Sequence, residues 1–350
     1  MIKRFLFGLF FLLYLPVILI SLLAVGAPFI STEWLPAVQF LPLGAQYFAP
    51  LHFLILLILS NSYWKTRLVA LVCFLACAYI LMKEYRMDLS AEEGPADVKM
   101  LSYNVQSFRY TPDQYIDSIG SLVAKLDPDI VCFQEFFNGP LKDKNQLALE
   151  ALSQLSGLPN DTIVTGNGNV GGAILSKYPI LAVERLFFTA KTANYGFWVK
   201  LQTPQGPLGV YNVHLASFQF ESKVPESGKW KPFLKTVYQK AASIIPEQKE
   251  QADLILAHAD KHSIPFILAG DLNSLPHSYI VSLFSTKYED SFMKAGSGYG
   301  ATFEIWGPLG MRIDYLFVSP TMKTLSHEVI SADISDHFPI MGEFIFSEEQ

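Results

Sequence analysis

The sequence predicts an α/β or α+β sandwich that follows about three N-terminal transmembrane helices. Two observations support this prediction. Apolar residues make up 51% of the 350 residues, and the excess is concentrated in residues 1–82. Beyond residue 97, short apolar runs alternate with turns that contain Gly or Pro and with amphipathic stretches. That alternation is typical of strands and helices that share one core.

Three apolar segments predict the membrane-spanning part, with helices at 5–25, 38–60 and 66–83. The first has no charged residue and matches the roughly 20 residues that a helix needs to cross a bilayer. The second is interrupted by Pro42 and Pro50, so the sequence defines the start of its helix poorly. The third is short for a full span, which favours a tight hairpin with the second.

The positions of Lys and Arg predict the orientation in the membrane. Lys3 and Arg4 precede the first span, Lys65 and Arg67 separate the second and third, and the first loop has neither residue type. The N-terminus is therefore expected in the cytoplasm, although Lys83 and Arg86, at the end of the third span, oppose this. A cleaved signal peptide over the first span is the alternative, and it leaves the larger domain outside as well. We expect an integral protein of a bacterial inner membrane whose larger domain faces the periplasm.

Cysteine content and net charge limit the kinds of protein to which this larger domain can belong. The three cysteines give no disulfide framework, and a domain of this size can bury a sufficient core without one. Residues 1–95 hold six of the 26 Lys and Arg residues and five of the 32 Asp and Glu residues. Residues 96–350 therefore hold 20 basic and 27 acidic residues, which gives this segment a net charge of −7. Nucleic-acid-binding domains usually carry a basic face, so nucleic acid is a partner that the charge disfavours without excluding it.

Apolar periodicity predicts the order of elements in the larger domain. Strands are expected at 98–105, 171–180, 197–203, 207–217, 264–274, 311–319 and 334–346, and a turn followed by a strand is expected at 127–136. Helices are expected at 113–126, 145–155 and 234–262, where apolar residues recur every three or four positions. The sequence has no internal repeat.

Polar residues end several of these apolar strands, where packing gives no reason for them. They are Asn104, Glu135, Asn212, His214, Asp271, Asn273, Asp314, Asp336 and His337. Each one alone is explained as well by a turn cap or a satisfied core residue. Several buried carboxylates, however, are costly without a shared partner, which predicts a hard cation. The oxygen ligands favour Mg²⁺, with Mn²⁺ or Ca²⁺ as alternatives, and the absence of a CxxC pair or a helical HExxH disfavours zinc there.

Seven short motifs occur in order between residues 97 and 346: SYN, FQE, GGAILSKYPI, NVHL, AGDLNS, RIDYLFVS and SDHFP. Together they resemble the endonuclease/exonuclease/phosphatase family, the DNase-I-like metal-dependent phosphoesterases. The resemblance implies a four-layer α/β sandwich, with two central β-sheets flanked by helices and an active site where strand ends converge. It divides the chain into a transmembrane anchor at 1–90 and a catalytic domain at 97–346.

The resemblance also implies a metal site. Glu135 is expected to be the principal Mg²⁺ ligand, and Asn104 and Asp336 are expected to complete or adjust the site. These three residues come from three separate strands, so the site can form only if the fold brings the strand ends together. Whether one or two metal ions act is left open.

Catalytic roles follow from the same resemblance. Asp271 would orient or deprotonate the attacking water, and Asn273 would hold water or a phosphate oxygen. His337 would donate to the phosphoryl oxygen, and Asp314 would fix the tautomer of that histidine and raise its basicity. His214 would contact phosphate or protonate the leaving group. The reaction would be an in-line displacement at phosphorus, assisted by preorganised positive charge.

The expected function is that of a membrane-anchored, Mg²⁺-dependent phosphoesterase that acts outside the cytoplasm on lipid head groups or small phosphorylated substrates. Membrane lipids are expected partners. Residues 217–235 place Phe218, Phe220, Trp230 and Phe233 among lysines, which suits a lipid interface or an ordinary surface loop equally. The alternatives are an extracytoplasmic nuclease and a non-catalytic membrane scaffold that binds phosphorylated ligands.

Overall fold

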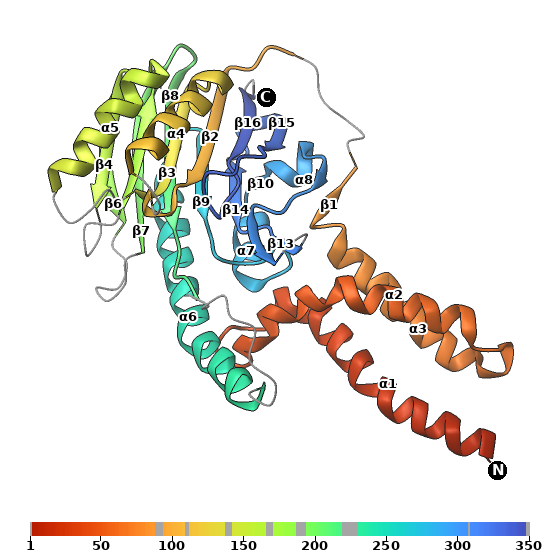
Figure 1. The fold of residues 1–350 in the computed structure, drawn as a ribbon. Helices are drawn as coiled ribbons and strands as arrows, with labels where there is room; N and C mark the ends of the chain where they lie inside the picture. Colours follow the sequence, from red (N-terminus) through yellow and green to blue (C-terminus); the bar gives the residue numbers. More distant parts are fainter. Residues whose placement is uncertain are drawn as a thin grey trace. The chain divides into compact units, whose positions relative to one another are not determined.

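The computed structural model describes residues 2–87, 94–108, 112–136, 142–165, 171–186, 194–218, 230–306 and 309–347. The chain divides into two compact units, shown with the rest of the fold in Figure 1. Unit 1 comprises Met1–Tyr85, Val224–Pro246 and Leu275–Ser282, and unit 2 comprises Arg86–Lys223, Glu247–Ser274 and Leu283–Gln350. The expected domain boundaries at residues 90 and 97 stay predictions.

Unit 1 contains three apolar helical segments, each long and apolar enough to cross a membrane. They are α1 (Ile2–Gly26), α2 (Ala45–Ile58) and α3 (Trp64–Leu81), with 3₁₀ turns η1 (Ala27–Phe29), η2 (Pro36–Gly44) and η3 (Asn61–Tyr63). The second segment begins as the 3₁₀ helix η2, and Pro42 inside it lacks the N–H that a regular α-helix would use. Leu13 and Leu57 remain 69% and 66% exposed, as expected of side chains that contact lipid.

Small and polar side chains fill the interior of this helical group. Ala70 and Cys73 are buried against Tyr14 and Ile55, where their size lets the helices approach closely. His52 is fully buried, and its two ring nitrogens form hydrogen bonds with the Tyr14 hydroxyl (2.5 Å) and the Ser21 hydroxyl (2.9 Å). The one histidine of the predicted spans is therefore fully hydrogen-bonded.

Two mixed six-stranded sheets form the centre of unit 2 (Figure 1). The first, here the β2 sheet, has the spatial order β15 (Met322–Val329), β16 (Ile340–Phe346), β2 (Val98–Asn104), β3 (Ile130–Phe136), β5 (Gly171–Ser176) and β4 (Asn160–Thr165). The second, the β9 sheet, has the order β10 (Glu289–Asp290), β14 (Asp314–Val318), β9 (Phe266–Asp271), β8 (Gly206–His214), β7 (Tyr195–Thr203) and β6 (Ile180–Leu186). Strands β2 and β3 pair in parallel, as do β8 and β9.

Helices cover the outer faces of the two sheets. Along β2, Met100 faces a core shared with the β9 sheet, whereas Leu101 faces α4 (Pro112–Leu126) and α5 (Lys142–Ser156) on the outside. Residues 247–259, the second part of α6 (Trp230–Ala259), bury Ala252 and Ile255, and His258 packs on Tyr211 of β8. These layers confirm the predicted four-layer α/β sandwich.

Several elements differ from the expected ones or add to them. The single strand expected at 171–180 is two strands, because the chain turns at Lys177–Pro179 and passes from β5 in one sheet to β6 in the other. The strand expected at 334–346 begins only at Ile340. The remaining elements are β1 (Tyr85–Arg86), η4 (Gln106–Phe108), α7 (Tyr279–Ser285), α8 (Ser291–Ala295), β11 (Gly298–Tyr299), β12 (Phe303–Trp306) and β13 (Leu309–Met311).

Asn212 joins the two sheets instead of forming part of a reactive cluster. Its amide nitrogen donates to the carbonyl oxygens of Phe133 (3.0 Å) and Ala173 (3.1 Å), and its amide oxygen accepts from Gln134 (3.0 Å). It is fully buried. The register of β3 with β5 shifts between Phe133 and Phe136, and Asn212 bonds beside this irregularity.

A buried ion pair fixes the start of β14. The Arg312 guanidinium donates to both carboxylate oxygens of Asp290 (3.1 and 2.9 Å), and it lies over the rings of Phe292 (4.9 Å) and Tyr315 (4.7 Å). Asp290 also accepts from the backbone N–H groups at the start of α8. These bonds satisfy a charge that would otherwise be costly to bury, and they hold the segment that leads directly into Asp314.

Next to this ion pair, His327 predicts a pH dependence of stability. It is buried, its Nδ1 lies 2.7 Å from the Ser291 hydroxyl, and burial lowers its pKa to about 3. Between the ordinary pKa of about 6.5 and about 3, the unfolded chain therefore binds one more proton than the folded chain. His327 should lower the free energy of unfolding as the pH falls through this range, by up to about 1.4 kcal/mol per pH unit.

The variant His327→Gln tests this expectation because glutamine can keep the bond to Ser291 but does not titrate. Urea unfolding of the full chain in detergent, followed from pH 7 to pH 4, should show a shallower loss of stability for His327→Gln than for the wild type. Identical pH profiles for the two proteins would contradict it.

Candidate active site

Sheet register places three candidate residues in one row across the β9 sheet. His214 is the partner of Asp271 in the parallel β8–β9 pair, and Asp271 is the partner of Asp314 in the antiparallel β9–β14 pair. Tyr195 on β7 pairs with the other side of His214. Asp314 begins its strand whereas His214 and Asp271 end theirs, and antiparallel pairing brings that beginning to the same edge of the sheet.

The β2 sheet supplies the other half of the site by the same rule. Asn104 ends β2, and Glu135 lies one residue before the end of β3. Asp336 and His337 precede β16, whose first residue, Ile340, pairs with Ser102 near the end of β2. All four therefore lie at one edge of the sheet, with Asp336 and His337 in the turn that leads into the strand.

Direct contacts join the site residues of the β2 sheet to those of the β9 sheet. The Asn104 amide nitrogen donates to Asp271 (3.2 Å) and to Glu135 (3.4 Å). His214 Nε2 lies 3.5 Å from the Glu135 carboxylate and 3.7 Å from that of Asp271. The structure thus brings the predicted metal ligand of the β2 sheet and the predicted catalytic residues of the β9 sheet into one cluster.

Unusual backbone conformations at or next to two site residues, Glu135 and Asp271, orient their side chains. Glu135 has φ +49° at the register shift of β3, and its backbone N–H donates to the Tyr195 hydroxyl (3.2 Å). Gly270 has φ +150°, and a Cβ there would lie 1.9 Å from the carbonyl oxygen of Val213, so only glycine fits before Asp271. Such conformations are held by their surroundings and are common at functional sites.

His337 and Asp314 form a buried pair. His337 Nδ1 lies 2.9 Å from the Asp314 carboxylate, and Nε2 lies 3.7 Å from Asp271. Burial alone would lower the pKa of His337, but Asp314, followed by Asp271 and Asp336, outweighs it and raises the pKa to about 10. His337 is therefore a cation at neutral pH, with Nδ1–H bound to Asp314 and Nε2–H directed into the cluster. The Phe303 ring packs at 4.9 Å from the imidazole.

His214 has the opposite electrostatic environment. It is 5% exposed, and burial lowers its pKa more than Glu135 raises it, so the imidazole is neutral at pH 7. Neither of its ring nitrogens has a hydrogen-bond partner among the described residues. A buried polar group without a partner is costly, and a ligand or water that supplies one is the usual explanation at such a site.

Two carboxylates of the cluster are disfavoured in their charged form by their surroundings. Burial, followed by the charge of Asp314, raises the pKa of Asp271 well above its ordinary value, and burial also raises that of Asp336. The His337 charge opposes both shifts but does not cancel them. A divalent cation fits this donor set, because it would neutralise the neighbouring carboxylates and could be bound by the amide oxygen of Asn104. One oxygen or ring-nitrogen atom from each of Asp271, Asp314 and His337 also lies within 4.8 Å of the other two, but the protonated His337 has no lone pair to bind a metal ion.

Asn273 lies beside the cluster. Its backbone N–H donates to Asp271 (2.8 Å), and its amide nitrogen donates to the carbonyl oxygen of Leu215 (3.1 Å). It has φ +47°, a conformation that asparagine tolerates better than most residues. The observed contacts orient Asp271 from the following turn.

Three residues of the site were not singled out from the sequence. Gln106 follows Asn104 in a left-handed turn and donates through its amide to Asp336. The Thr302 hydroxyl accepts from the backbone N–H of Asp314 (3.1 Å), and the Ser335 hydroxyl donates to the carbonyl oxygen of Asn104 (2.9 Å). Gln, Thr and Ser are common in turns, so their types gave no signal before the long-range contacts were known.

The fold and this cluster define a protein of the DNase-I-like class: an α/β sandwich with carboxylates, an amide and two histidines at one edge of paired sheets. The chain belongs to the Endonuclease/Exonuclease/phosphatase family, whose sequence model matches residues 101–337 and so includes all eight predicted site residues. Members of this family act on phosphoester bonds as nucleases or phosphatases. A comparison with functionally curated proteins gives no significant match.

Solved structures share the fold. An endonuclease/exonuclease/phosphatase from Beutenbergia cavernae DSM 12333 has a TM-score of 0.54 and 20% identity, over 72% of each chain. A mannosyl-6-phosphatase from Bacteroides thetaiotaomicron VPI-5482 has a TM-score of 0.52 and 20% identity, over 71% of this chain and 100% of that one. D. rerio TDP2 in complex with a single-strand DNA product has a TM-score of 0.53 and 17% identity, over 71% and 98%. Similarity at these identities shows the fold alone.

Proposed function

We propose that this protein is a membrane-anchored, Mg²⁺-dependent phosphoesterase that hydrolyses lipid head groups or other small phosphorylated substrates outside the cytoplasm. The observation that carries the proposal is the position of His214, whose Nε2 lies 3.5 Å from Glu135 and 3.7 Å from Asp271, beside the cationic His337. Negative, neutral and positive groups in one cluster are what a displacement at phosphorus requires.

Each side chain has a task that follows from its environment. Asp271, held by Asn104 and by the backbone of Asn273, orients the attacking water and accepts its proton as the oxygen bonds to phosphorus. His337 donates Nε2–H to a phosphoryl oxygen on which negative charge develops, and Asp314 keeps it protonated. His214 has both ring nitrogens available for a phosphate oxygen or the leaving-group oxygen.

Glu135, Asn104 and Asp336 are the residues that would hold the metal ion. Gln106 and Ser335 orient Asp336, and Tyr195 bonds the backbone of Glu135, so the ligands are themselves supported. When bound, Mg²⁺ supplies Lewis-acid stabilisation of charge on the phosphoryl group.

Charge and membrane attachment support a small or lipid substrate. The net charge of −7 for residues 96–350 opposes the many phosphate contacts on which binding of long nucleic acids depends. The three candidate spans would hold the domain at a membrane. The neighbour named a mannosyl-6-phosphatase favours a small phosphorylated substrate, whereas the neighbour in complex with a single-strand DNA product favours the nuclease alternative. Phe218, in the aromatic segment 217–235, is buried and so does not support a lipid-contacting loop there. The side chains of Phe220, Trp230 and Phe233 lie outside the described residues.

A substrate panel tests the proposal. Full-length protein in detergent would be assayed with Mg²⁺ at physiological salt on phospholipid vesicles, bis-(p-nitrophenyl) phosphate and supercoiled plasmid. We expect hydrolysis of the first two and slow or no nicking of the plasmid. Rapid nicking would overturn the substrate class in favour of the nuclease. No turnover on any substrate, together with binding of inorganic phosphate, would favour the non-catalytic scaffold.

A further inference from the structure

A second group of metal-ligating side chains, Glu184, His258 and His262, lies on the outer face of the β9 sheet. Glu184 on β6 pairs with Trp198 on β7, and Trp198 pairs with Tyr211 on β8, so these three form one row. Tyr211 neighbours Asn212, which faces the β2 sheet, and therefore points to the opposite side. His214 points to the same side as Asn212, so the candidate active site and this second group lie on opposite faces.

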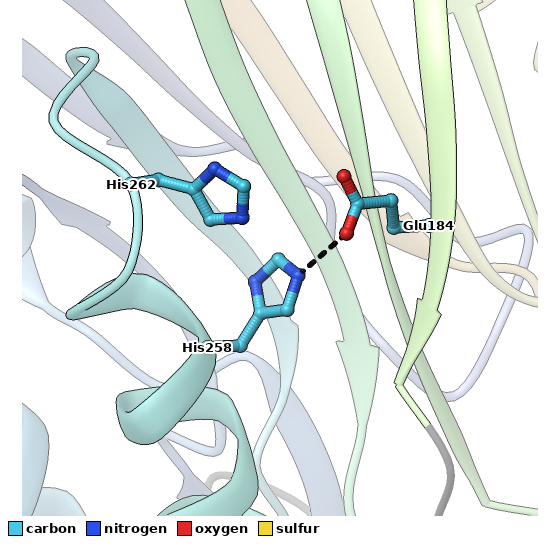
Figure 2. A group of neighbouring side chains, drawn as sticks. All are labelled: Glu184, His258 and His262. Carbon is cyan, nitrogen blue, oxygen red and sulfur yellow. Dashed lines mark hydrogen bonds and ion pairs between the residues drawn. The ribbon is translucent and has the colours of Figure 1, made fainter.

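The three side chains converge on one point (Figure 2). His258 lies near the end of α6 and His262 follows four residues later, a spacing that places both rings on one side of a helical end. His258 Nε2 is 3.2 Å from the Glu184 carboxylate, and the two imidazole centroids are 4.5 Å apart. One ligand atom from each residue lies within 4.8 Å of the other two.

Neighbouring aromatic residues hold the two rings in place. His258 Nδ1 is 2.9 Å from the Tyr211 hydroxyl, which leaves Nε2 as the nitrogen that faces Glu184. Burial raises the pKa of Tyr211 above its ordinary value, so this hydroxyl is a neutral phenol that can accept Nδ1–H. The His262 ring stacks on Trp198 at 4.5 Å. A histidine ligand that donates its second N–H to a fixed partner is the usual arrangement around bound metals.

The chemistry of these donors differs from that of the active site. Two imidazoles and one carboxylate suit a borderline cation such as Zn²⁺, whereas Mg²⁺ prefers oxygen ligands. Imidazole is uncharged above its ordinary pKa of about 6.5. A neutral imidazole is the form that binds metal.

We propose that Glu184, His258 and His262 bind one Zn²⁺ ion that joins edge strand β6 to the C-terminal end of α6. An ion pair between His258 and Glu184 explains only one of the three contacts, because it gives the neighbouring His262 imidazole no role. A cation between the three groups explains all of them. Because β6 is the last strand of its sheet, a metal link to α6 would stabilise an edge that pairs on one side only.

Zinc titration of the full-length protein tests this site. Protein in detergent, freed of metal with a chelator, would be titrated with Zn²⁺ by calorimetry in excess Mg²⁺, and its thermal midpoint would be measured with and without Zn²⁺. For Glu184→Gln and for the double variant His258→Gln/His262→Gln, we expect one Zn²⁺ equivalent per chain fewer than for the wild type. The rise of the midpoint on adding Zn²⁺ should be lost in the same variants.

Glu328→Gln is the matched control, since Glu328 is also an exposed glutamate on an edge strand, and it should keep the wild-type stoichiometry. Glu184 is exposed and glutamine has its shape, so this variant should fold even if the double variant does not. Equal Zn²⁺ stoichiometry and an equal midpoint rise in wild type, Glu184→Gln and Glu328→Gln would overturn the proposal. Zinc bound at the active site would appear equally in all three proteins and is thereby separated from this site.

Discussion

Replacing Asp271 with asparagine should lower kcat/KM for bis-(p-nitrophenyl) phosphate by about 10²–10⁴-fold, the usual contribution of a positioned general base. Asp271 is 1% exposed, and both Asn104 and the backbone of Asn273 donate to it. Asparagine has nearly the same shape but cannot accept the proton of the attacking water. The loss should therefore appear chiefly in kcat, while the Mg²⁺ concentration that gives half-maximal activity changes little.

Asp253→Asn is the control for this variant. Asp253 lies on α6 in an exposed ion pair with Lys249, so removing its charge should leave kcat/KM near the wild-type value. A wild-type rate for Asp271→Asn would contradict the assigned role. If the main change were instead a large increase in the required Mg²⁺ concentration, Asp271 would be a metal ligand and not the base.

Replacing His337 with alanine should lower kcat by about 10²–10³-fold, as expected when one donor to a developing phosphoryl charge is removed. The reason is electrostatic: His337 is the one cation in direct contact with the described cluster of carboxylates, and Asp314 holds it in the charged form. Asp314→Asn should reproduce part of the loss, because Asp314 acts through His337 and not on the substrate.

The comparison of these two variants tests the pairing itself. If Asp314 acts only through His337, Asp314→Asn should lower kcat little further in a protein that already carries His337→Ala. The two losses of kcat should therefore not add. His327→Gln, a change to a buried histidine near α8, should leave kcat unchanged and serves as the control. Additive losses in the double variant, or normal turnover by His337→Ala, would refute the pair.

The polar strand ends were predictable from the sequence because chemistry and periodicity agree there. An apolar strand that ends in Asp271 or Glu135 has a carboxylate where packing alone would favour an apolar residue. Several strands that end in this way indicate a shared site. The same reasoning included Asn212, which the structure shows to be a bond between the sheets. A buried amide that satisfies backbone carbonyls and one that faces a ligand have the same sequence signature.

Other parts depend on long-range geometry that local sequence does not encode. Gln106 reaches Asp336 only because residues 106–108 adopt left-handed backbone conformations after β2. The passage of the chain between sheets at Lys177–Pro179 was hidden inside one apolar run, and the prediction of a single strand there was wrong. The second cluster was missed because Glu184 and His258 are 74 residues apart and meet only through sheet register.

The most direct test of the central claim is the metal dependence of hydrolysis by the full-length protein. Turnover of bis-(p-nitrophenyl) phosphate should disappear on treatment with EDTA and return as Mg²⁺ is added, and Glu135→Gln should need a much higher Mg²⁺ concentration than the wild type or the exposed control Glu150→Gln. Full activity in EDTA, or the same Mg²⁺ dependence for Glu135→Gln and the wild type, would contradict a metal-dependent phosphoesterase centred on Glu135.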